Sequence, residues 1–185
     1  MLFNKKKMSV QELFDGEQKV KTKLIDEYGW PITTESVKQN LSLIIEKVDL
    51  DDDIEAMLTP DDRANGRIQI NTKYADDETF DYLHEVIHYI EDVGVGNKVT
   101  RSYPRLHAGN REDPHERQID YMAAVALVPG NELLRRIEYY RKHWHNIDEI
   151  RFMHDLQKEF KCSAACLRER LKEVHTLRRH RLLPL

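Results

Sequence analysis

Five consecutive residues near the middle of the chain, His84-Glu85-Val86-Ile87-His88, have the pattern HExxH. On a helix, residues four apart lie on one face, so His84 and His88 could both bind one zinc ion. Glu85 lies beside that face, where its carboxylate can take a proton from a water molecule that the metal activates. The pattern therefore predicts hydrolytic zinc chemistry, with Glu85 as the general base that passes the proton to the leaving amine of a peptide.

The composition makes this pattern informative. With 9 His among 185 residues, roughly 0.04 such matches arise by chance. The apolar residues around the motif recur at the helical period and predict a helix over about residues 77–93; they are Phe80, Leu83, Val86, Ile87 and Ile90. The alternative interpretation is two surface histidines on an acidic helix.

A catalytic zinc site needs a third protein ligand and an open fourth position. The downstream candidates are His107, Asp113, His115, Glu116 and Asp120. Asp113-Pro114 is typical of a helix start, which places Glu116 and Asp120 one turn apart on one face. One could bind the metal while the other holds the free ring nitrogen of a ligating His. Spacing alone leaves the choice open, and a helix-capping role for Asp113 and Glu116 is the alternative.

The elements that must position these residues predict an α+β domain, mostly helical, with a small antiparallel sheet. We expect an N-terminal helical segment over residues 1–48, including a helix from Thr34 to Val48, a metallopeptidase core over 49–142 and a C-terminal helical region over 143–185. Within the core, we expect strands at Ile54–Leu58 and Arg67–Ile70, with a hairpin turn at Asn65-Gly66. Residues 97–111 have no clear periodicity and predict a long loop.

Composition excludes several classes of protein. The net charge of −4, with 29 basic and 33 acidic residues, argues against a nucleic-acid coat along the whole chain. The longest apolar run, Tyr121–Val128, is too short to cross a bilayer, so we expect no membrane partner. Two cysteines, and a lysine-rich start at Met1–Lys7 without a signal-peptide apolar region, predict a cytoplasmic protein.

Three stretches together resemble the ImmA/IrrE-type zinc metallopeptidases, over roughly residues 54–175. They are Arg67-Ile68-Gln69-Ile70-Asn71 followed by Phe80 and the HExxH motif; Glu116-x-x-Ile119-Asp120-x-Met122-Ala123-Ala124-x-x-Leu127-Val128-Pro129; and Phe160-Lys161-Cys162-Ser163 followed by Leu167 and Arg170-Leu171. The chain departs from the family at Ile87, where Gly is usual, at Met122, where an aromatic residue is usual, and at Ile119, where a small residue is usual. These are packing changes that leave the metal chemistry intact.

The resemblance implies a zincin-like fold with a helix-turn-helix-like C-terminal part packed on the core. It implies one Zn²⁺ held by His84, His88 and Glu116, with manganese as the alternative metal. It also implies that Glu85 is the base and that Asp120 supports a ligand. The implied activity is cleavage of a specific intracellular protein, a helix-turn-helix repressor, which derepresses a phage, a mobile element or a stress response. The alternative is a non-hydrolytic anti-repressor that binds its repressor partner with a structural metal.

Other residues carry weaker expectations. We expect the strand Arg67, Ile68, Gln69 and Ile70 to form a sheet edge above the cleft, where an extended substrate adds as a further strand. Tyr103 or His107 could stabilise the oxyanion, but a role as ordinary loop residues is the favoured interpretation. Cys162, Cys166 and His154 could bind metal, but burial of the cysteines as small apolar residues is the favoured interpretation.

The C-terminus is basic, and we expect two helices there, at about residues 148–160 and 163–177, joined by a short turn. The cations are Arg168, Arg170, Lys172, Arg178, Arg179 and Arg181, opposed by Glu169 and Glu173. A solvated face or a docking surface for an acidic partner is favoured over direct DNA reading, which we do not expect.

Overall fold

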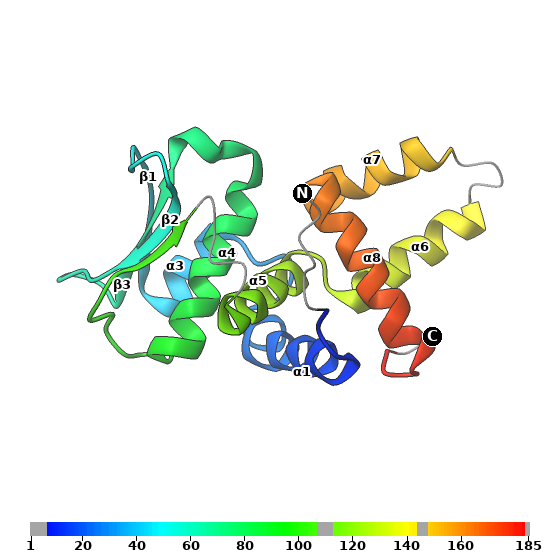
Figure 1. The fold of residues 1–185 in the computed structure, drawn as a ribbon, viewed down its shortest axis with the longest axis horizontal. Helices are drawn as coiled ribbons and strands as arrows, with labels where there is room; N and C mark the ends of the chain where they lie inside the picture. The colour runs from blue at the N-terminus through cyan, green and yellow to red at the C-terminus, as the bar shows by residue number, and fades with distance from the viewer. Residues whose placement is uncertain (1–6, 107–112, 144–147, 184–185) are drawn as a thin grey trace.

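The computed structural model describes residues 7–106, 113–143 and 148–183. Figure 1 shows a small sheet at one end of the molecule, helices α6, α7 and α8 at the other, and helices α1 and α5 between them. The chain is therefore a mostly helical α+β protein, as the sequence predicts. His107 lies outside the described residues.

The first helical segment of the described chain has recognisable sequence signals at its start and at its end. Helix α1, Val10–Val20, begins at Ser9, whose hydroxyl accepts from the Glu12 N–H while the Glu12 carboxylate accepts from the Ser9 N–H. A π-helical turn, Lys21–Ile25, and the short α2, Asp26–Tyr28, continue it. The helix ends at Gly29, whose φ of 79° favours glycine.

The predicted helix from Thr34 to Val48 is wrong in its second half. Helix α3 covers Thr34–Leu41 and stops at Ser42, which has a left-handed φ of 53°. Residues Leu43–Val48 form strand β1, so the predicted N-terminal helical segment ends before its last six residues. The apolar residues of this stretch fit a helical period, but its β-branched residues pair with another strand instead.

Four strands in the described part of the chain form one sheet, in the order β1-β3-β2-β4. Strand β2 is Ile54–Thr59, β3 is Gly66–Asn71 and β4 is Tyr103–Leu106. Strands β1 and β3 are parallel, whereas β2 is antiparallel to both of its neighbours. The sheet is therefore mixed rather than purely antiparallel, and β4 lies inside the segment predicted to be a loop.

The predicted substrate-binding edge at Arg67–Ile70 is wrong, because β3 lies inside the sheet and pairs with strands on both sides. Ile68 and Ile70 are buried in the core. Arg67 pairs with Glu46 at 2.5 Å and Asp61 at 2.7 Å, and Gln69 donates to Glu46 at 3.0 Å. No strand edge is free at these four residues.

The connection between β2 and β3 is longer than the predicted two-residue turn and spans residues 60–65. Asn65 closes it by donating through its side chain to the carbonyl of Leu41 at 3.0 Å. Gly66 opens β3 where a Cβ would lie 2.5 Å from the side chain of Val99, so only glycine fits this close approach.

Two helices carry the motif residues. Helix α4, Glu78–His88, follows a 3₁₀ segment at Thr72–Asp77 and continues into a π-helical turn at Tyr89–Val93. It packs against β2 and β3 on one side and against α5, Pro114–Leu127, on the other. Asp113 caps α5 and Pro114 occupies its first turn, as predicted.

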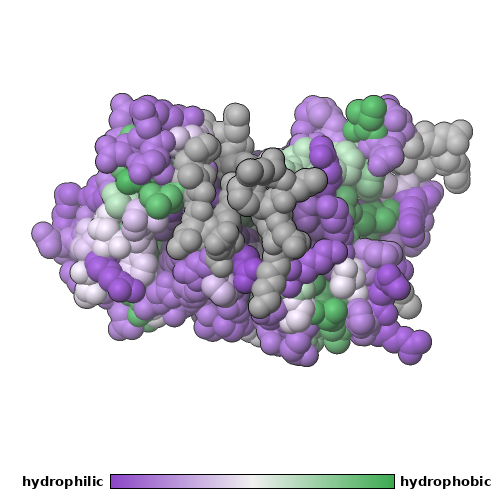
Figure 2. Space-filling view, viewed as in Figure 1, coloured by the Kyte–Doolittle hydropathy of each residue, from purple (hydrophilic) through white to green (hydrophobic). Residues whose placement is uncertain are grey.

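Three further helices complete the chain: α6, Gly130–His143; α7, Glu149–Phe160; and α8, Ala164–Arg179. Lys161, with a left-handed φ of 51°, makes the turn between α7 and α8. No helix among the described residues is long and apolar enough to cross a membrane. Figure 2 shows that the face turned toward the viewer is mostly hydrophilic, with small hydrophobic spots.

Candidate metal centre

Helix α4 presents the HExxH residues to the interior between the sheet and α5. His84, Glu85 and His88 are 2%, 0% and 5% exposed. Buried polar side chains need partners, and the two imidazoles find theirs in each other and in nearby carboxylates. The surface-histidine interpretation is therefore wrong.

Helix α5 brings Glu116 to the two histidines. Its carboxylate oxygens lie 3.4 Å from His84 Nε2 and 3.5 Å from His88 Nε2, and the two Nε2 atoms are 3.0 Å apart. Ligand atoms of His84, His88 and Glu116 all lie within 4.8 Å of one another. The structure thus brings together the three residues predicted as ligands.

The spacing of these atoms fits a small tetrahedral cation. Ligand atoms about 2.0–2.1 Å from a tetrahedral zinc lie about 3.3 Å apart. The observed separations of 3.0, 3.4 and 3.5 Å bracket that value. Two imidazole nitrogens and one carboxylate are also the donor set that zinc accepts at catalytic sites.

The other ring nitrogens are held by two aspartates. His84 Nδ1 lies 3.0 Å from Asp120 Oδ1, and His88 Nδ1 lies 2.7 Å from Asp92 Oδ2. An ionised carboxylate only accepts hydrogen bonds, so each Nδ1 carries a proton and each Nε2 faces the shared space. A positive charge there, either a metal ion or a proton on one Nε2, would satisfy both nitrogens and the Glu116 carboxylate.

Burial and the neighbouring charged groups shift the pKa of each histidine. Burial alone would lower the pKa of His84, but its hydrogen bonds to Asp120 and Glu116 outweigh burial and raise the pKa to about 9. Burial and the neighbouring His84 lower the pKa of His88. The hydrogen bond to His84 lowers the pKa of the Glu116 carboxyl. The centre thus favours one positive charge shared by its ligands.

Glu85 differs from the two buried histidines beside it. Neither of its carboxylate oxygens has a hydrogen-bond partner, although the side chain is fully buried. Burial raises its pKa to about 7, partly offset by the positive charges of His84 and Arg105. A buried carboxylate without partners is costly in a fold, so this one is typical of a functional group.

The neighbouring histidine, His115, does not join the three ligands. Its Nε2 lies 2.9 Å from Asp92 Oδ1, so Asp92 holds both His115 and His88. His88, Asp92 and His115 are themselves close enough to hold a metal ion. Sequence reasoning missed Asp92, although its position four residues after His88 places it on the same helical face.

Strand β4 supplies the remaining neighbours of the centre. The ring of Tyr103 lies 5.8 Å from that of His88, centroid to centroid. Tyr103, one of the two residues considered as an oxyanion stabiliser, is thus beside the centre. Arg105 from the same strand donates to Asp120 at 3.2 Å.

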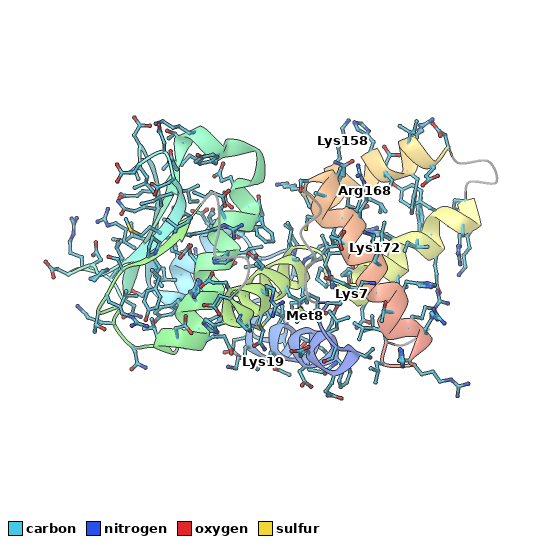
Figure 3. All side chains as sticks on the ribbon, in the orientation of Figure 1. Lys7, Met8, Lys19, Lys158, Arg168 and Lys172 are labelled. Carbon is cyan, nitrogen blue, oxygen red and sulfur yellow. The ribbon has the colours of Figure 1, made fainter. Side chains whose placement is uncertain are left out.

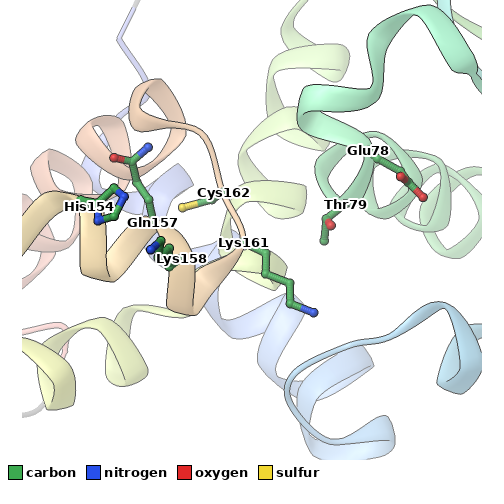
Figure 4. A pocket seen from close by; sticks show the side chains of 7 residues that line it. All are labelled: Glu78, Thr79, His154, Gln157, Lys158, Lys161 and Cys162. Carbon is green, nitrogen blue, oxygen red and sulfur yellow. The ribbon is translucent and has the colours of Figure 1, made fainter.

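The C-terminal cysteines lie apart from this centre. A cavity of about 440 Å³ lies between Glu78 and Thr79 of α4 and the α7–α8 region, where Cys162 and His154 line it. Figure 4 shows the side chains that line this cavity. Cys162 is buried and Cys166 half-buried. The groups that could hold a metal among the described residues include neither cysteine, which agrees with the interpretation of burial.

The basic C-terminus divides between two faces of α8. Arg170 is fully buried. Arg168 and Lys172 are exposed on the opposite side, and Figure 3 shows them on α8 with Lys158 on α7. Lys172 pairs with Glu169 at 2.7 Å. This exposed face is compatible with a solvated surface or an acidic partner.

Comparison with known proteins adds no relative to this picture. No protein-family model matches the chain, and no curated protein matches it significantly. The resemblance to the ImmA/IrrE-type peptidases therefore stands on the motif residues, of which His84, His88 and Glu116 converge in the fold.

Proposed function

We propose that the protein is a zinc-dependent endopeptidase. The observation that carries the proposal is Glu85, a fully buried carboxylate without a partner beside the converging atoms of His84, His88 and Glu116. Zinc held by these three residues would polarise a peptide carbonyl and lower the pKa of water. A purely structural metal site would have no use for an unpaired buried carboxylate at this position.

The residues around the centre have different roles in the proposed reaction. Glu85 accepts the proton of the attacking water and passes it to the leaving amine, a task suited to a carboxyl whose pKa burial raises toward neutrality. Asp120 and Asp92 hold the rings of His84 and His88 in the orientation that directs both Nε2 atoms inward.

The proposed substrate is an extended segment of another protein. Strand β4 borders the centre through Tyr103 and Arg105. It pairs with β2 on one side and with no described strand on the other. A substrate segment would add to this free edge by main-chain hydrogen bonds, which moves the predicted edge from β3 to β4.

The resemblance to ImmA/IrrE-type peptidases names the class of substrate. We propose a helix-turn-helix transcriptional repressor in the cytoplasm, whose cleavage derepresses a phage, a mobile element or a stress response. Direct DNA binding and a membrane partner are not part of the proposal. The alternative function, a non-hydrolytic anti-repressor, needs the same partner but not Glu85.

The test is co-expression of candidate repressors with the protein and with Glu85→Gln. We expect the wild-type protein to cleave its repressor, and Glu85→Gln to keep its zinc but to lose cleavage, because the amide cannot accept the proton. Glu35→Gln, at an exposed position on helix α3, is the matched control and should cleave normally. Cleavage by Glu85→Gln would refute the mechanism, and relief of repression without cleavage by either protein would favour the anti-repressor.

A further inference from the structure

Arg105 is a partly buried cation at the meeting point of the sheet and both metal-site helices. Its side chain is 17% exposed. Its Nε donates to Glu55 of β2 at 2.8 Å and lies 3.7 Å from Asp81 of α4. Its guanidinium also lies over the ring of Phe80, 4.8 Å from the centroid. These contacts fix the planar group in one orientation.

The Nη1 atom of Arg105 is linked to the metal centre through Asp120. Its Nη1 donates to Asp120 Oδ1 at 3.2 Å, and the same oxygen accepts from His84 Nδ1 at 3.0 Å. The Asp120 side chain is 41% exposed. A carboxylate this exposed is held weakly by any single partner, because surface pairs are weak. Arg105 anchors it from the sheet, through the same oxygen that His84 contacts.

The strand that carries Arg105 contacts His88 directly and His84 through Asp120. Tyr103 and Arg105 are two residues apart, so their side chains leave β4 on the same face. Tyr103 lies against the ring of His88, and Arg105 reaches His84 through Asp120. The Tyr103 and Arg105 side chains, on one face of β4, therefore support both histidine ligands of the proposed metal site.

We propose that Arg105 is a positioning residue that orients His84 for zinc binding by anchoring Asp120. The inference rests on the proposed zinc centre but not on peptidase activity. It predicts that loss of the guanidinium loosens Asp120 and with it the His84 ring, so that zinc binds more weakly. Loss of a group that orients a ligand weakens metal affinity by about 10- to 100-fold.

The experiment measures zinc affinity by competition with a chelator, and the visible absorption of the cobalt-substituted protein. Arg105→Met should bind zinc about 10- to 100-fold more weakly and change the cobalt spectrum. Arg67→Met is the matched control, because Arg67 is 22% exposed and pairs with two carboxylates in the same sheet. It should leave zinc affinity and the cobalt spectrum unchanged.

Two further variants separate positioning from folding. Arg105→Lys keeps the charge but cannot span Glu55 and Asp120 together, so it should fold stably and still bind zinc weakly. Combined with Asp120→Asn, Arg105→Met should weaken zinc binding little beyond Asp120→Asn alone, since both act through one contact.

Three results would overturn the inference: wild-type zinc affinity in Arg105→Met, wild-type affinity in Arg105→Lys, or additive losses in the double variant. A wild-type protein that binds no zinc would overturn the proposed centre together with it. Zinc binding without any peptidase activity would refute only the proposed function.

Discussion

Substitution of Arg170 by methionine should destabilise the protein strongly. Arg170 lies on α8, is 0% exposed and donates to Glu17 of α1. It also donates to the Val128 carbonyl after α5 at 3.1 Å and to Glu173 at 2.8 Å. This one side chain therefore joins the C-terminal helix to two helices of the rest of the chain.

The magnitude follows from what the substitution leaves behind. Methionine fills much of the space, but the Glu17 side chain, 8% exposed, then lies buried without its cation. Removing one partner of a buried ion pair costs about 3–5 kcal/mol. In a protein of this size, that loss lowers the melting temperature by roughly 6–20 °C.

Urea and thermal unfolding followed by circular dichroism measure the effect. Glu17→Gln added to Arg170→Met should recover part of the loss, because no unpaired charge then remains buried. Arg168→Met, on the exposed face of the same helix, is the control and should change the free energy of unfolding by at most about 0.5 kcal/mol. A loss below about 1 kcal/mol in Arg170→Met would refute the reasoning.

Two further predictions concern α4 and the turn that follows it. Asp92→Ala should weaken zinc binding by about 10- to 100-fold, because His88 Nδ1 loses its acceptor at 2.7 Å; chelator competition measures this, and unchanged affinity would contradict the role of Asp92. Burial would raise the pKa of Glu91, but Lys19 and Lys23 outweigh it and lower the pKa below its usual 4.5. The ionised Glu91 therefore stabilises the fold above about pH 4.5, and this stabilisation is lost as the pH falls further. Glu91→Gln should thus be less stable than the wild type in urea at pH 7 and nearly equal to it at pH 3, and an equal difference at both pH values would count against the pairing.

Local signals in the sequence predicted the motif helix and the start of α5. The apolar period predicts a helix around the motif, and Asp113-Pro114 marks a helix start; the structure confirms both. The stretch after Thr34 failed because its apolar residues satisfy a helical period as well as a buried strand. Only the parallel pairing with β3, a non-local contact, decides between the two.

The order of the strands in the sheet could not be predicted from the sequence. The hairpin of β2 and β3 is local and was predicted, but the flanking strands come from distant parts of the chain. Strand β1 precedes the hairpin and β4 follows the motif helix, so β3 became an interior strand. Strand β4 has only four residues, including Pro104, and gives too short a pattern to recognise.

Site residues that are close together in the sequence were predicted better than those that the fold brings together from distant segments. The spacing of His84 and His88 fixes their common face on any helix. Glu116 lies on another helix, and its residue type and the family resemblance, rather than spacing, singled it out. Arg105 gave no signal, because its contact with Asp120 depends on how β4 packs against α5.

The amount of zinc bound by Glu116→Ala and His115→Ala tests the central claim most directly. Glu116 faces both Nε2 atoms at 3.4 and 3.5 Å, whereas His115 Nε2 is held by Asp92. Mass spectrometry of the purified proteins under native conditions should find one zinc per chain in the wild type and in His115→Ala, and none in Glu116→Ala. Zinc retained by Glu116→Ala and lost from His115→Ala would contradict the ligand set, and with it the proposed peptidase.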